Sequence, residues 1–161
     1  MRAEDPPVMA AHYAELGWAK TVALFERYLA EQSAGDRPVL VAEADEIFAG
    51  HVTVLWRSSY EPFVEAGIPE ISDLNVLPGF RRRGIATALM DEAERIVGER
   101  SDVAGLGVGL YADYGPAQRM YVQRGYLPDG RGVVYDWSPV TPGASIPIDD
   151  DAVLMMTRRL R

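Results

Sequence analysis

The chain has 161 residues, with 16 Lys and Arg against 24 Asp and Glu, which gives a net charge of −8. Its length predicts a single domain over residues 1–161. The acidic balance argues against a nucleic-acid partner, because binding phosphates along a polymer calls for net positive charge. Cysteine is absent, which excludes disulfides, cysteine nucleophiles and thiolate metal sites.

No apolar run approaches the ~18 residues of a membrane span. Residues 1–7 lack the basic and apolar pattern of a signal peptide. We therefore expect a cytoplasmic enzyme with no membrane partner. The only histidines are His12 and His51, so a three-histidine metal site is excluded. Three carboxylates at 149–151 are typical of a solvated turn, and we expect no metal.

The first half of the chain alternates between helical and strand patterns. Residues 1–7 are expected to form an irregular lead, and a helical pattern follows from about residue 11 to 31, with Gly17 marking a break. Apolar, β-branched runs at 38–44 and 47–56 predict a hairpin that turns at Asp45-Glu46. A loop over 57–69, with one helical turn near 60–65, leads to a third strand at 70–77.

The second half contains one strong helix and several shorter elements. The helix follows the loop 78–84 and runs to about Val97, with apolar residues on one face. A strand at 103–111 and a short helix at 116–124 follow, and Gly125 is the expected helix stop. Strands at 133–137 and 152–160 complete the pattern. The sequence thus predicts an α/β (α+β) domain with a mixed sheet.

The most informative segment joins the third strand to the strong helix. It reads Arg81-Arg82-Arg83-Gly84, and Gly84 can take a sharp turn without steric strain. Backbone amides from about Arg82 to Thr87 then lack helical partners, and the helix dipole favours an anion there. Because three arginines stand together in an acidic protein, we expect the ligand to be a polyphosphate.

Two motifs in this sequence resemble signatures of the GNAT N-acetyltransferase superfamily. Arg81-Arg-Arg-Gly84-Ile-Ala86 is similar to the pyrophosphate-binding motif of that superfamily. The segment Ala117–Tyr126 resembles its second signature, a short helix that ends in Tyr-x-x-x-Gly-aromatic. The two occur in the usual order and at about the usual separation. The tail segments 124–132 and 149–154 are similar to an uncharacterised bacterial branch.

The resemblance implies a GNAT-like mixed, mostly antiparallel central sheet with helices on both faces, whose first edge strand is short or absent. It implies acetyl-CoA as co-substrate and no metal. Tyr114 departs from the family pattern, because it stands where the family has an asparagine that touches the cofactor. The residues that would bind acetyl-CoA are Leu74, Asn75, Val76, Arg81, Arg82, Arg83, Gly84, Ile85, Ala86, Thr87, Tyr114 and Ala117.

The resemblance also implies direct transfer of the acetyl group to a primary amine of a small molecule or peptide. Tyr121 matches the general acid of the family, since a phenol is protonated at neutral pH. Glu70 and Asp73 are both candidates for the general base, and a water chain is the third option. A backbone amide of the strand 74–76 would stabilise the oxyanion. His51, among apolar neighbours, is expected to be a structural histidine.

Two alternative functions stay open at this stage. One is a non-catalytic module that binds or senses acyl-CoA, which the departure at Tyr114 favours and Tyr121 opposes. The other is transfer of a longer acyl group. The resemblance also allows a homodimer, and the sequence does not name the acceptor amine.

Overall fold

The computed structural model describes residues 1–161, and its seven strands follow the order β1-β2-β3-β4-β7-β5-β6. The chain divides into a first unit, Met1–Trp56 with Ser72–Ile96, and a second unit, Arg57–Ile71 with Val97–Arg161. Strand β3 (Glu70–Val76) contributes residues to both units. The single domain over residues 1–161 stays a prediction.

The first unit pairs a β-hairpin with three helices. The break at Gly17 is confirmed, because this residue has a left-handed φ of 72° between the first two helices. The hairpin is also confirmed, and its turn residues Asp45 and Glu46 have φ values of 54° and 63°. The elements are α1 (Asp5–Glu15), α2 (Val22–Ala34), β1 (Val39–Ala44), β2 (Ile47–Leu55), the 3-10 turn η1 (Pro78–Phe80) and α4 (Ile85–Gly98).

The irregular lead expected over residues 1–7 is wrong, because α1 begins at Asp5 and includes Pro6 and Pro7. Proline is well tolerated in the first turn of a helix, where its missing N–H would have no partner. The Asp5 carboxylate accepts a hydrogen bond of 2.5 Å from the backbone N–H of Arg2 and so folds the chain into the helix. No strand precedes α1 in the structure.

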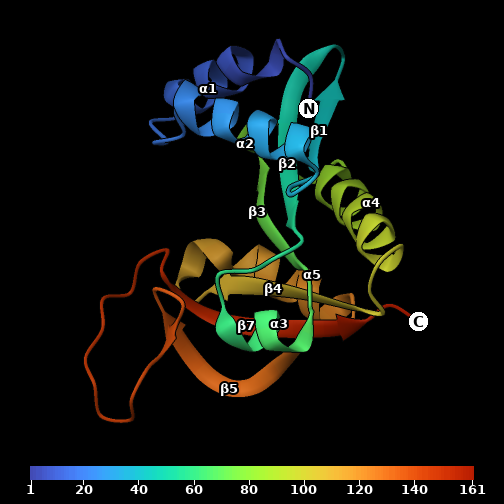
Figure 1. The fold of residues 1–161 in the computed structure, drawn as a ribbon. Coiled ribbons are helices and arrows are strands. Elements are labelled where there is room, and N and C mark those ends of the chain that lie inside the picture. Colours follow the sequence, from blue (N-terminus) through green and yellow to red (C-terminus); the bar gives the residue numbers. More distant parts are fainter. The chain divides into compact units, whose positions relative to one another are not determined.

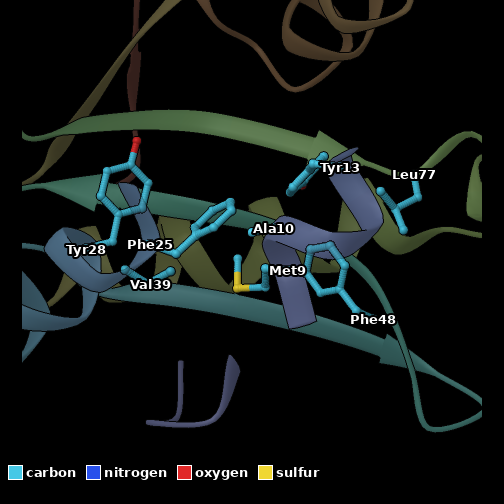
Figure 2. Packing of buried hydrophobic residues seen from close by; sticks show 8 residues of the cluster. All are labelled: Met9, Ala10, Tyr13, Phe25, Tyr28, Val39, Phe48 and Leu77. Carbon is cyan, nitrogen blue, oxygen red and sulfur yellow. The ribbon is translucent and has the colours of Figure 1, made fainter. Parts of the chain in front are cut away.

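The core of the first unit lies between helices α1 and α2 and the hairpin. Figure 2 shows its eight buried residues, namely Met9, Ala10, Tyr13, Phe25, Tyr28, Val39, Phe48 and Leu77. Burying a large apolar side chain contributes about 2 kcal/mol, so this cluster fixes both helices on one face of the strands. Figure 1 shows α4 on the other side of the same strands.

The second unit is built mainly from antiparallel strands. Strand β3 starts parallel to β4, with Glu70 opposite Gly105, while β4–β7, β5–β7 and β5–β6 are antiparallel pairs. The predicted mixed, mostly antiparallel sheet is therefore confirmed. The other elements are α3 (Glu61–Ala66), β4 (Val103–Gly109), the 3-10 turn η2 (Ala112–Tyr114), α5 (Gly115–Gln123), β5 (Leu127–Tyr135), β6 (Ser138–Pro139) and β7 (Ala152–Arg159).

Strand β5 is longer than the pattern 133–137 predicts, and β6 was not predicted. The register of β5 against β7 shifts between Pro128 and Val133, so an irregularity divides it into two short paired pieces. Proline and glycine in that interval resemble a turn in the sequence, although the strand continues past them. None of the helices combines the length and the apolar character that a membrane crossing requires.

Candidate active site

Asp73 stands in the middle of β3 with a left-handed φ of 55°. A residue with a side chain rarely adopts this conformation, and within a strand it re-aims the peptide groups that follow. The segment that follows is Leu74–Val76, which the sequence assigns to cofactor binding.

Four side chains of the first unit donate hydrogen bonds to the Asp73 carboxylate. Lys20 Nζ lies 2.5 Å from Oδ1, and Asn75 Nδ2 lies 2.7 Å from the same oxygen. His51 Nε2 lies 3.0 Å from Oδ2, and the Tyr28 hydroxyl lies 3.1 Å from it. His51 is fully buried, and its Nδ1 lies 2.7 Å from the Tyr13 hydroxyl. We call these six residues the Asp73 network.

The Asp73 network determines the charge of its central carboxylate. Burial by itself would raise the pKa of Asp73, but the hydrogen bond from His51 and the nearby Lys20 ammonium hold it well below its ordinary value of 3.8. Burial and the nearby Asp73 charge raise the pKa of Tyr28 to about 12, so this phenol stays a donor. Asp73 is therefore an ionised, fully engaged carboxylate, which makes it a weak proton acceptor.

The loop after β3 gives α4 an exposed N-terminal end. Arg82 and Gly84 have φ values of 61° and 81°, so the chain turns sharply before the helix. The first helical hydrogen bond runs from the N–H of Ala88 to the carbonyl of Gly84 at 2.9 Å. The amides of residues 85–87 precede that bond, so they have no acceptor within the helix. This end of α4 can bind an anion.

The three arginines of this loop are exposed, and none of them forms an ion pair. Arg81 donates from Nε to the carbonyl of Val76 at 3.1 Å, which ties the loop to the end of β3. The Arg83 guanidinium lies 5.4 Å from the ring centroid of Phe80. The positive charge of the loop is thus available to a ligand, and it fits the pyrophosphate predicted from the sequence.

Gly50 on β2 allows the backbone of β3 to approach closely. A Cβ atom at this position would lie 2.4 Å from the carbonyl oxygen of Asn75 and 3.1 Å from the Cα of Val76. Any side chain there would displace β3, so the position of residues 75 and 76 depends on this glycine.

Tyr121 lies in α5 of the second unit and is 7% exposed. Its ring packs edge-on against Tyr126, with centroids 5.9 Å apart. Burial raises the pKa of Tyr121 to about 12, so its hydroxyl keeps its proton across the neutral range. That state is the one required of a general acid.

Glu70 lies at the start of β3 in the second unit and is 2% exposed. Its carboxylate accepts a short hydrogen bond from the Ser58 hydroxyl, whose oxygen in turn accepts from the N–H of Tyr60 at 2.9 Å. The segment before α3 therefore holds this carboxylate in place.

Tyr114, which departs from the family pattern, contacts Gly109 and Asp150. Its ring covers Gly109, where a Cβ atom would lie 2.4 Å from it, and its hydroxyl donates to Asp150 at 2.9 Å. Tyr111 donates to the same carboxylate oxygen. Ala117 lies in the first turns of α5, half-buried.

The sequence prediction missed half of the Asp73 network. The structure brings Asp73 and residues 74–76 and 81–87 together in the first unit, while Glu70, Tyr114, Ala117 and Tyr121 belong to the second. His51 is structural as expected, but Tyr13, Lys20 and Tyr28 were not singled out. One signal was available, because Lys20 is the only lysine in the sequence.

The model of the Acetyltransferase (GNAT) family matches residues 7–126. The chain belongs to this family. The match covers both the arginine loop and Tyr121, so the resemblance seen in the two motifs is confirmed, and with it the assignment of the chain as an acetyltransferase. Among curated proteins, none matches the sequence.

Solved structures support the GNAT fold over the whole chain. An N-acetyltransferase from Staphylococcus aureus Mu50 has a TM-score of 0.73 and 15% identity, over 100% of this chain and 96% of its own. A ribosomal-protein-alanine N-acetyltransferase from Brucella melitensis has a TM-score of 0.70 and 20% identity, over 99% of this chain and 97% of its own. A proposed acetyltransferase from Salmonella typhimurium, solved with acetyl-CoA, has a TM-score of 0.68 and 20% identity, over 100% of this chain and 91% of its own.

Proposed function

We propose that this GNAT acetyltransferase moves the acetyl group of acetyl-CoA directly to a primary amine of a small molecule or peptide. The observation that carries the proposal is the loop before α4, where exposed arginines without ion pairs meet the free amides of a helix end. Such a loop suits the pyrophosphate of coenzyme A. Its place in a matched family domain supports the same co-substrate.

Each predicted cofactor residue has a role in this proposal. Residues Leu74, Asn75 and Val76 would hold the pantetheine arm through their backbone, and Arg81, Arg82 and Arg83 would face the phosphates. The turn at Gly84 and the amides of Ile85, Ala86 and Thr87 complete the phosphate site. Ala117 would line the cofactor from α5, whereas Tyr114 is held by Asp150 and contributes less than the family's asparagine.

The reaction joins the amine nitrogen to the acetyl carbon and breaks the carbon–sulfur bond. The amine loses a proton to a base, directly or through water, and the departing sulfur takes one from the Tyr121 hydroxyl. The sequence offers two carboxylates as base, and we infer that Glu70 is the better candidate of the two. Asp73 is the weaker candidate, because Lys20 and His51 keep its pKa low.

The test is a panel of amines incubated with acetyl-CoA, in which release of free coenzyme A is measured with a thiol reagent. The protein itself has no cysteine, so it contributes no background thiol. We expect acetyl-CoA to raise the melting temperature and at least one amine to release coenzyme A. Thermal stabilisation without release on any amine would instead identify an acyl-CoA sensor, and no stabilisation would reject the cofactor assignment.

A second experiment tests the general acid. Tyr121→Phe keeps the ring that packs on Tyr126 and removes only the hydroxyl. We expect kcat to fall by about 100-fold, with stabilisation by acetyl-CoA unchanged. A variant as active as the wild type would reject this role for Tyr121.

A further inference from the structure

The Asp73 network connects several elements of the first unit to one strained residue. Tyr13 comes from α1, Lys20 from the segment between the first two helices, Tyr28 from α2 and His51 from β2. All converge, directly or through His51, on the carboxylate of a residue in β3 whose φ is 55°. The strain in the backbone and the hydrogen bonds to the side chain thus coincide at one position.

A left-handed residue inside a strand persists only where its surroundings hold it. The Lys20–Asp73 contact supplies such a hold, with side chains only 21% and 15% exposed. Asn75 adds a local clasp, because its amide donates both to the carboxylate and to the carbonyl of Asp73 at 3.2 Å. These contacts set where the peptide groups of residues 74–76 point, and Gly50 lets β2 support them from its side.

We propose that Asp73 is a positioning residue, whose carboxylate, held by Lys20, Tyr28 and His51, keeps the backbone of Leu74–Val76 in the conformation that acetyl transfer requires. This inference rests on the proposed function, since it assigns those peptide groups to the acetyl-bearing end of the co-substrate. Asp73 acts through the backbone and accepts no proton from the amine. A misplaced oxyanion donor lowers kcat more than it changes KM.

The first test compares three substitutions at this position. Alanine removes the carboxylate and disfavours the left-handed conformation, whereas glycine removes the carboxylate but accepts that conformation. We expect Asp73→Ala to lower kcat by about 100-fold with KM for acetyl-CoA within about twofold. The kcat of Asp73→Gly should be at least about tenfold higher than that of Asp73→Ala. The kcat of Asp73→Asn should lie between those of the alanine and glycine variants.

The second test removes the donor. Lys20→Met should lower kcat by about tenfold without shifting the pH profile, because Lys20 moves no proton in the reaction. Arg2→Met is the matched control, since Arg2 forms an exposed ion pair with Glu43 at 3.5 Å in the same unit. We expect this control to retain wild-type kcat.

Hydrogen exchange of the backbone amides of residues 74–76 gives a readout that does not depend on activity. We expect exchange to quicken in Asp73→Ala and Lys20→Met and to stay near wild type in Arg2→Met. Unchanged exchange in Asp73→Ala would overturn the inference, as would equal kcat in the glycine and alanine variants, which is the behaviour of a proton acceptor. Altered exchange in a protein that acetylates no amine would reject the proposed function, and it would show only that Asp73 holds the backbone of residues 74–76.

Discussion

Lys20 and the three arginines at 81–83 are cationic side chains of the same unit, yet the structure uses them in opposite ways. Lys20 is largely buried, and its charge is paired with the carboxylate of Asp73, the strained residue of β3. The arginines are exposed and face no carboxylate, in a chain that has 24 acidic residues. The difference distinguishes a cation that maintains the fold from cations that remain available to a ligand.

The largest effect should come from reversing the charge of the arginine loop. We expect Arg82→Glu with Gly84→Glu to weaken acetyl-CoA binding by more than about 100-fold, because repulsion and a strained turn replace attraction. Loss of the thermal shift with acetyl-CoA measures it. Arg57→Glu, an exposed arginine of the second unit, is the control and should keep the shift. Persistence of the shift in the double variant would reject the phosphate site.

The free energy of unfolding should depend on Lys20 and hardly on the arginine loop. Lys20→Met leaves the Asp73 carboxylate without its ammonium partner, and we expect unfolding free energy to fall by about 2 kcal/mol. Arg82→Gln with Arg83→Gln should change it by less than about 0.5 kcal/mol, because exposed side chains contribute little. Chemical denaturation of both variants measures the contrast. Equal losses would erase the distinction between the two kinds of cation.

Acid should weaken the first unit through Asp73. Its pKa is lowered in the folded protein, so the folded state holds that proton less tightly than the unfolded chain. The stability from Asp73 is therefore present above its unfolded pKa of 3.8 and is lost as pH falls below it. Unfolding free energies between pH 3 and 6 should fall less steeply in Asp73→Asn than in wild type. Parallel slopes would contradict the lowered pKa.

The smallest effect should be that of salt. Between about 0.05 and 0.5 M NaCl we expect acetyl-CoA affinity to fall by about threefold, because exposed charges are screened. The stability difference between wild type and Lys20→Met should hardly change, since a largely buried pair is screened much less. Calorimetric titration and denaturation measure the two. If salt reduced the contribution of Lys20 to the free energy of unfolding, the Lys20–Asp73 pair would be exposed to solvent rather than largely buried.

Sequence reasoning succeeded where the determining residues lie close together in the chain. The turn at Asp45-Glu46, the stop at Gly125 and the loop 81–84 each act through their immediate neighbours. The predicted start of α1 was wrong, because proline breaks a helix at most positions but is tolerated in the first turn, where Pro6 and Pro7 lie.

The Asp73 network could not be predicted, for a different physical reason. Lys20 lies 53 residues from Asp73 in sequence, and Tyr28 lies 45 residues from it. Only the packing of α1 and α2 on the hairpin brings them to β3. No periodicity in the sequence marks such contacts, and the sequence therefore offered Asp73 as a base rather than as an anchor.

The single lysine has a practical consequence for an enzyme that delivers acetyl groups to amines. Lys20 Nζ lies 2.5 Å from the Asp73 carboxylate, with both side chains largely buried. The Lys20 ammonium is held by this ion pair, so the single lysine of the folded chain is a poor acetyl acceptor. Peptide mass spectra after incubation with acetyl-CoA should show Lys20 unmodified, and acetylation of Lys20 would report that its contact with Asp73 has opened.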